Sequence, residues 1–176
     1  HHGFAYPVPQ TFSDEQAAPL LCGGVIGYRA LRLSEARPGE VLGLQGMANS
    51  MQIQYQEETA HALKFYSYVV DRGGRVVLEA IEKPPVEWKS ALAVFEGVLE
   101  HERHVTDRIN KLADLAVELK DHATHAVLEW FICEQVEEEA TVETVISKLR
   151  LLGETGPGAF MLDQELGQRV FTPPAA

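Results

Sequence analysis

The sequence has little cysteine, no long apolar run and no excess of basic residues. Its only two cysteines, Cys22 and Cys133, cannot build a disulfide framework, and we expect both to be free thiols in a reducing cytoplasm. No apolar run reaches the roughly 20 residues that a membrane-spanning helix needs, and the opening His-His-Gly does not resemble a signal peptide. The net charge of −11 makes nucleic acid and anionic membranes poor partners but metal cations plausible ones.

The chain does have enough apolar residues to build a core. Of its 176 residues, 45 % are hydrophobic and 23 % are charged, which is typical of a globular protein. Apolar side chains such as Met47, Met51, Tyr55, Leu63 and Tyr66 recur at three- and four-residue steps. This spacing predicts three long helices, over 44–72, 87–118 and 122–151, and a short one over 159–169. We therefore predict a single all-α domain.

The connections between the segments indicate how the helices run. Gly73 and Gly74 favour a helix end, Pro84-Pro85 excludes a helix, and Asp121 is a suitable N-cap. The linker 73–87 can extend ~50 Å, whereas a helix of this length is ~43 Å long. The linker can therefore cross the whole bundle and make its flanking helices parallel. A fourth long helix is expected within 1–43, although many prolines and glycines there oppose it.

Four polar residues lie near the middle of the long predicted helices. Glu58 is the midpoint of 44–72, Glu102 lies at the midpoint of 87–118, and Glu138 falls about one residue past the midpoint of 122–151. Midpoints of similar helices meet in a bundle whether neighbours run parallel or antiparallel. Glu58 and His61 share one helix face, because they are three residues apart. A buried carboxylate without a partner costs several kcal/mol or takes up a proton. A divalent metal pair would satisfy all four side chains together.

Further polar residues surround this group. Gln135 precedes Glu138 by one helical turn on the same face. The acidic neighbours are Glu57, Glu134, Glu137 and Glu139. They either extend the metal site or form a solvated acidic face, and for Glu139 we favour the solvated face.

Several stretches resemble the bacterial non-haem ferritins. They are Gln56–Tyr66, Asp71–Val76 with Pro84–Trp88, His101-Glu102, Leu128–Glu139 and Phe160–Leu166. The resemblance runs from about Gly43 to Arg169. It implies a ferritin-like four-helix bundle with a long crossover between the second and third helices and a short C-terminal fifth helix.

The resemblance also implies roles for the polar residues. Glu58 would bridge two irons, His61 would bind the first, and Glu102 would bind the second together with Gln135 and Glu138. Glu57, Glu134 and Glu137 resemble a neighbouring third iron site. Dioxygen or hydrogen peroxide would oxidise Fe(II), and ferric mineral would collect inside a cage of 24 identical subunits. Thr59 and the Gln135-x-x-Glu138 pair argue against a haem-containing relative.

Residues 17–42 depart from the family. The first helix of the family supplies one more glutamate. If this helix packs antiparallel to 44–72 through a turn near 41–42, the residue opposite Glu58 is Val25. Glu15 and Glu35 are ten residues away, or ~15 Å along a helix, too far to substitute. The abrupt return of the resemblance at Leu42 suggests a local reading-frame disturbance or a sequence error. The chain could therefore also be a shell subunit whose ferroxidase site is incomplete, weak or inactive.

The sequence is compatible with two further classes of helical protein. The chain could be a structural bundle that binds no metal, in which case replacing Glu58 would not change iron binding. It could also be a small electron-transfer protein of the rubrerythrin kind. The absence of a Cys-x-x-Cys iron site from the sequence disfavours the rubrerythrin class.

Overall fold

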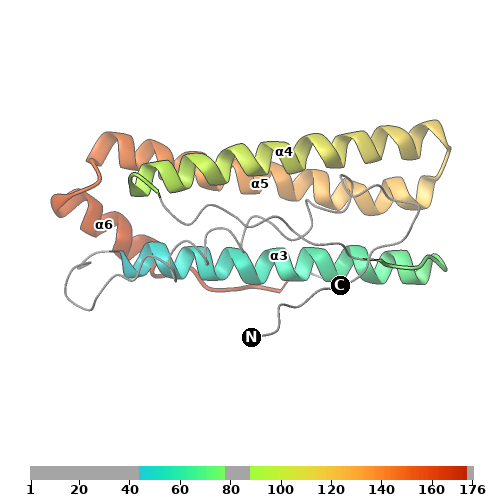
Figure 1. Ribbon diagram of the computed structural model, residues 1–176, viewed down its shortest axis with the longest axis horizontal. Coiled ribbons are helices and arrows are strands. Elements are labelled where there is room, and N and C mark those ends of the chain that lie inside the picture. Colours follow the sequence, from blue (N-terminus) through green and yellow to red (C-terminus); the bar gives the residue numbers. More distant parts are fainter. Residues whose placement is uncertain (1–43, 78–87, 174–176) are drawn as a thin grey trace. The chain divides into compact units, whose positions relative to one another are not determined.

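A computed structural model describes residues 44–77 and 88–173, and these residues form four helices (Figure 1). The helices are α3 (Gln45–Asp71), α4 (Ala91–Glu118), α5 (His122–Leu152) and α6 (Gly156–Leu166). No strand occurs within the described ranges, so the all-α class is confirmed. The expected first helix, Val25, Cys22 and Pro84-Pro85 lie outside the described residues. None of the described helices combines the length and apolar character that crossing a bilayer requires.

The ends of the long helices follow from capping residues. α3 ends at Asp71, and Gly73 then adopts a left-handed φ of 75°, which glycine reaches without steric cost. α5 begins after Asp121, whose carboxylate accepts a hydrogen bond from the Thr124 backbone N–H at 3.2 Å. α4 begins at Ala91 rather than at the predicted residue 87. The reason is Ser90, whose extended backbone and hydroxyl group cap the Ala93 N–H.

The short helix α6 begins and ends three residues before the predicted 159–169. Gly156 starts it with a φ of 82°, and Pro157 follows in the first turn. Backbone N–H groups there have no partner within the helix, so a proline costs no hydrogen bond. Arg169, which the prediction placed at the helix end, instead follows a turn in which its N–H bonds the Leu166 carbonyl.

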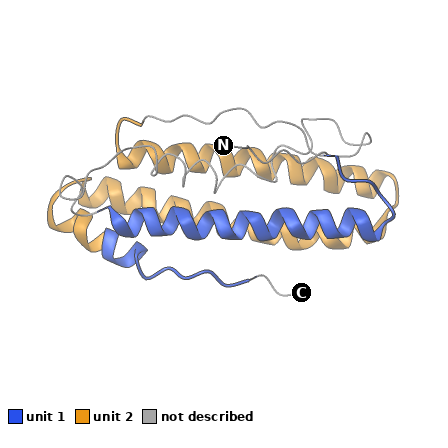
Figure 2. Cartoon of the chain, turned by 60° about the horizontal axis from the view of Figure 1, so that its bottom comes forward, with its two compact units in different colours: residues 1–87, 163–176 blue, residues 88–162 orange. Residues whose placement is uncertain are grey.

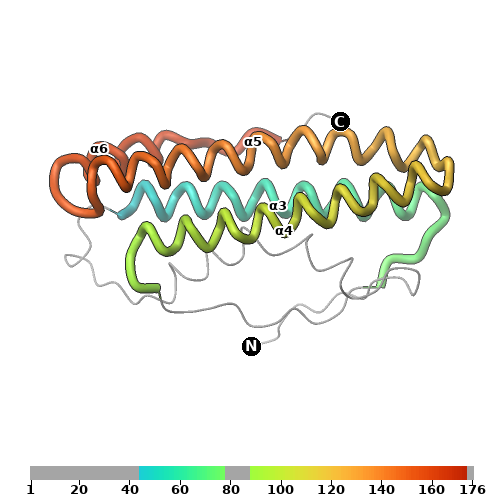
Figure 3. Tube along the Cα trace, turned by 90° about the horizontal axis from the view of Figure 1, so that it is seen from above, coloured from blue at the N-terminus to red at the C-terminus, as the bar shows by residue number. Residues whose placement is uncertain are grey.

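The chain divides into two compact units, residues 1–87 with 163–176 and residues 88–162 (Figure 2). The predicted single domain stays a prediction. In the second unit, α4 and α5 lie side by side and run antiparallel, joined by residues 119–121 (Figure 3). The hydrophobic core of this unit includes the buried residues Phe95, Val98, Val105, Ile109, Leu128, Phe131, Val142 and Leu149.

In the first unit, the end of α6 and the segment after it contact the first turns of α3. Asp163 accepts a hydrogen bond from the Met47 N–H at 2.9 Å, and the Asn49 side chain donates to the Arg169 carbonyl at 2.9 Å. The backbones approach so closely at Gly46 that a Cβ atom there would lie 1.6 Å from the Asp163 carbonyl oxygen. Only glycine fits this position, and the contact fixes the C-terminal segment against α3.

Candidate metal centre

The five polar residues predicted as principal metal ligands are all buried. Their exposed fractions are 7 % for Glu58, 6 % for His61, 1 % for Glu102, 4 % for Gln135 and 4 % for Glu138. Charged side chains are almost never buried to this extent unless they are paired or bind a metal. This burial is not what a solvated acidic face would show.

Glu58 and His61 lie one turn apart in the middle of α3. The His61 Nδ1 atom is 3.7 Å from the Glu58 Oε2 atom. Gln54, one turn earlier, donates its side-chain amide to the other carboxylate oxygen of Glu58 at 3.4 Å. The pair thus presents a carboxylate oxygen and an imidazole nitrogen from one helix face, a ligand combination that suits iron as well as zinc.

The second unit brings Glu102 of α4 together with Gln135 of α5. The Gln135 Nε2 atom donates to the Glu102 carboxylate at 3.3 Å and to the Glu102 backbone carbonyl at 3.2 Å. Because the amide nitrogen faces Glu102, the amide oxygen is the atom that Gln135 would offer to a cation. Glu138 follows one turn later on the same buried face of α5.

The flanking acids differ from this buried set. Glu57 is half-buried and forms an ion pair with Arg169 at 2.5 Å, Glu134 is half-buried, and Glu137 is exposed. Glu139 accepts a hydrogen bond from the Thr106 hydroxyl at 2.6 Å and lies 3.7 Å from Arg103. Glu139 is half-buried rather than part of a freely solvated face, and Thr106 also accepts a hydrogen bond from the buried Gln135 amide at 3.4 Å.

Sequence reasoning missed three residues that contact the predicted ligands: Gln54 contacts Glu58, Thr106 contacts Gln135, and Arg169 contacts Glu57. Gln54 could have been found, because it precedes Glu58 by four residues on the same helix face. Arg169 gave no local signal, since it lies 112 residues from Glu57 in the chain.

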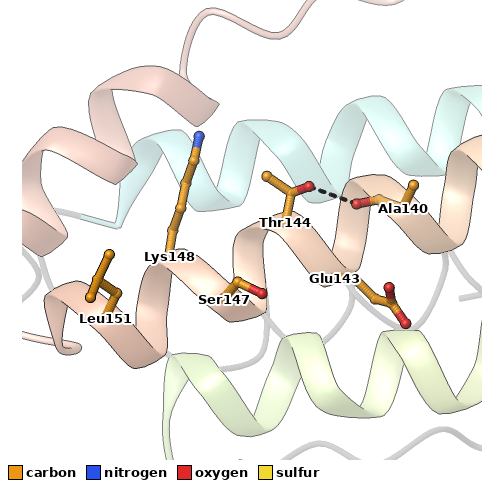
Figure 4. A pocket seen from close by; sticks show the side chains of 6 residues that line it. All are labelled: Ala140, Glu143, Thr144, Ser147, Lys148 and Leu151. Atoms are coloured by element: carbon orange, nitrogen blue, oxygen red, sulfur yellow. Dashed lines mark hydrogen bonds between the residues drawn. The ribbon is translucent and has the colours of Figure 1, made fainter.

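A shallow hollow on α5 is a weaker candidate for a functional site (Figure 4). Its six lining residues are Ala140, Glu143, Thr144, Ser147, Lys148 and Leu151. The Thr144 hydroxyl is used within the helix, where it donates to the Ala140 carbonyl at 2.8 Å. The other side chains follow one another along the helix and do not converge on a point. We therefore assign no function to this hollow.

A helical fold that buries carboxylates and an imidazole is typical of helical metal-binding proteins. The family described as the ferritin-like domain matches residues 40–152, which include parts of both units and all five buried polar residues. The chain belongs to this family. The resemblance noted in the sequence is thereby confirmed, and the membership supports the predicted function of iron storage.

Curated relatives and solved structures agree with this assignment. A bacterial non-heme ferritin of Bacteroides fragilis is 42 % identical over 127 residues, which are 72 % of this chain and 79 % of the relative. A bacterial non-heme ferritin of Staphylococcus epidermidis is also 42 % identical, over 126 residues, which are 72 % of this chain and 76 % of the relative. A humanized archaeal ferritin superposes with a TM-score of 0.82 at 42 % identity, covering 91 % of this chain and 94 % of its own. An open-pore ferritin from Archaeoglobus fulgidus superposes with a TM-score of 0.80 at 43 % identity, covering 89 % of this chain and 94 % of its own.

Proposed function

We propose that this protein binds two Fe(II) ions at the buried polar set, oxidises them and stores the ferric product. Glu58 bridges the two ions, His61 binds the first, and Glu102 binds the second together with Gln135 and Glu138. The observation that carries the proposal is the burial of all five side chains, because removing carboxylates from water costs free energy that hydrogen bonds from neutral groups only partly offset. Two divalent cations would offset that cost.

The ligand types fit this chemistry. Carboxylate and amide oxygens suit iron, and a single imidazole leaves coordination positions open for an oxidant. Each Fe(II) gives one electron to dioxygen or hydrogen peroxide and leaves as Fe(III). The carboxylates lower the cost of the additional positive charge on the product. The site requires no haem.

A third iron site is part of the proposal. Glu57, Glu134 and Glu137 are its ligands by their match to the family pattern. Their greater exposure supports a weaker site, because exposed carboxylates are better hydrated and interact with a cation through a higher dielectric. Such a site would pass iron between the buried pair and the mineral.

A second candidate function is a shell subunit with an incomplete ferroxidase site. The family match begins only at residue 40, and Val25 stands where we expect the glutamate of the first helix. A missing carboxylate would weaken the first iron site, because one negative ligand fewer would face the ion. This form would still assemble and store iron, but it would oxidise Fe(II) more slowly.

Exposed apolar side chains support assembly into a homo-oligomer, for which we propose 24 subunits. On α3, Tyr55, Leu63 and Tyr66 are exposed although the sequence pattern suggested core positions. On α6, Phe160 and Met161 are also exposed. Apolar surface of this kind marks protein–protein contacts. A cytoplasmic location stays a prediction of the sequence.

Anaerobic Fe(II) titration followed by stopped-flow oxidation tests the proposal. We expect tight Fe(II) binding in the intact protein and its loss, with slower oxidation, in Glu138→Ala. The matched control is Glu129→Ala, which removes an exposed carboxylate from the same helix. Two tight ions per subunit would indicate a complete site, and one would select the incomplete form. Identical binding and rates in Glu138→Ala and the intact protein would refute both.

A further inference from the structure

Arg169 reaches the proposed metal-binding face of α3 from the segment that follows α6. Its Nη2 atom is 2.5 Å from the Glu57 carboxylate, and its Nη1 atom donates to the Gln54 side-chain oxygen at 3.0 Å. The Ser50 hydroxyl lies at 3.5 Å from the same Nη1 atom. One guanidinium therefore contacts three successive turns of α3.

This ion pair is not an ordinary surface contact. The Arg169 and Glu57 side chains are 25 % and 19 % exposed, whereas the Arg150–Glu96 pair on α5 and α4 is 63 % and 45 % exposed. Less water screens the first pair, and a short charge-assisted hydrogen bond is stronger than a neutral one. The backbone around Arg169 is also held independently, because the Asn49 side chain donates to the Arg169 carbonyl.

Gln54 connects this contact to Glu58. Its oxygen accepts from Arg169, so its nitrogen is turned toward Glu58, to which it donates at 3.4 Å. Glu57 and Glu58 thus have different partners: an arginine holds the first, and a neutral amide donates to the second. A metal ion at Glu57 would have to share this carboxylate with the guanidinium or displace it.

We propose that Arg169 is a resident cation at Glu57, and that a metal ion gains this carboxylate only by displacing the guanidinium. The inference rests on the proposed function, because Glu57 is assigned there to the weaker third site. Competition of this kind keeps the third site empty at low iron and opens it when iron is abundant. Arg169 acts as a positioning residue, since it touches a ligand and not the metal.

Zn²⁺ titration of the intact protein by calorimetry tests the proposal, because zinc binds such ligands without being oxidised. The titration should show a tight phase from the buried site and a weaker phase from the third site. In Arg169→Gln we expect the Zn²⁺ affinity of the weaker phase to increase about tenfold, while the affinity of the tight phase changes little. If Arg169 only stabilised the local structure, its loss would instead lower the Zn²⁺ affinity of the weaker phase. Arg169→Lys keeps the charge but loses the guanidinium fork, and we expect a smaller gain of about threefold.

Two further variants make the result specific. Arg150→Gln removes a more exposed arginine–glutamate pair and should leave both phases unchanged. Glu57→Gln combined with Arg169→Gln should abolish the gain, because the released carboxylate is then absent. Unchanged or weaker second-phase binding in Arg169→Gln would overturn the inference. If Arg169→Gln does not fold, unchanged or weaker second-phase binding in Arg169→Lys would overturn the inference. If the intact protein shows no tight Zn²⁺-binding phase, the result would instead contradict the proposed function.

Discussion

Gln135 donates its side-chain amide to both the carboxylate and the backbone carbonyl of Glu102, at 3.3 and 3.2 Å. The two residues come from adjacent antiparallel helices and lie near the middle of each. An amide can be a donor here, whereas a carboxylate could not. The choice of glutamine at this position therefore stabilises the buried Glu102 in the metal-free protein.

Gln135→Glu should destabilise the metal-free protein. The substitution replaces a donor with a second carboxylate beside Glu102, and we expect a loss of about 2 kcal/mol from the free energy of unfolding. The melting temperature should fall by roughly 4 to 8 °C, and added Zn²⁺ should restore it, because the cation gains a ligand. Differential scanning calorimetry measures both effects. Gln164→Glu, on the exposed side of α6, is the control, and equal melting temperatures for the two variants would contradict this explanation.

His61→Ala should weaken Fe(II) binding. Loss of a supporting residue around a metal site costs about 10- to 100-fold in affinity, and loss of a direct ligand should cost at least as much. Anaerobic titration monitors the effect. His104→Ala removes an exposed histidine from α4 and should leave the affinity unchanged. Equal affinities for His61→Ala and His104→Ala would remove His61 from the ligand set.

Gly46→Ala should destabilise the contact between α3 and the end of α6. The new methyl group would lie 1.6 Å from the Asp163 carbonyl oxygen, so the backbone must move, at a cost of about 3 kcal/mol. Gly73→Ala is the comparison. It meets no atom within 4 Å of the new Cβ and carries only the cost of a left-handed backbone, about 1 kcal/mol. Urea unfolding should show the larger loss for Gly46→Ala, and the reverse order would be inconsistent with the close packing.

The nucleotide sequence can test why the family resemblance begins abruptly near residue 42. We expect one of the other two reading frames over codons 15–43 to encode a helical segment that contains a glutamate near codon 25 and several tyrosines. Translation of both frames measures this directly. If neither frame contains a glutamate or a tyrosine-rich helix, the frame hypothesis fails, and the incomplete site becomes a property of the protein.

Much of the described fold follows from local rules. Glu58 is the middle residue of α3 as the structure defines it, and apolar spacing together with the Asp121 cap placed α5 almost to the residue. The burial of Glu102 and Glu138 could be anticipated because a mid-helix position on the apolar face leaves an acid little access to water.

Other features depend on information that a local pattern does not contain. The Arg169–Glu57 contact joins residues 112 positions apart. Tyr55, Leu63 and Tyr66 follow a core-like spacing, yet they are exposed, because periodicity shows that a face is apolar and not which surface covers it. The predicted start of α6 is wrong because proline, which breaks a helix interior, is tolerated in the first turn.

The most direct test is anomalous X-ray scattering at the iron edge from crystals of the intact protein soaked anaerobically in Fe(II). We expect iron peaks within coordination distance, roughly 2.0 to 2.3 Å, of the Glu58, Glu102 and Glu138 carboxylates and of a His61 ring nitrogen. Peaks confined to exposed carboxylates, with none beside these four side chains, would contradict the proposed site.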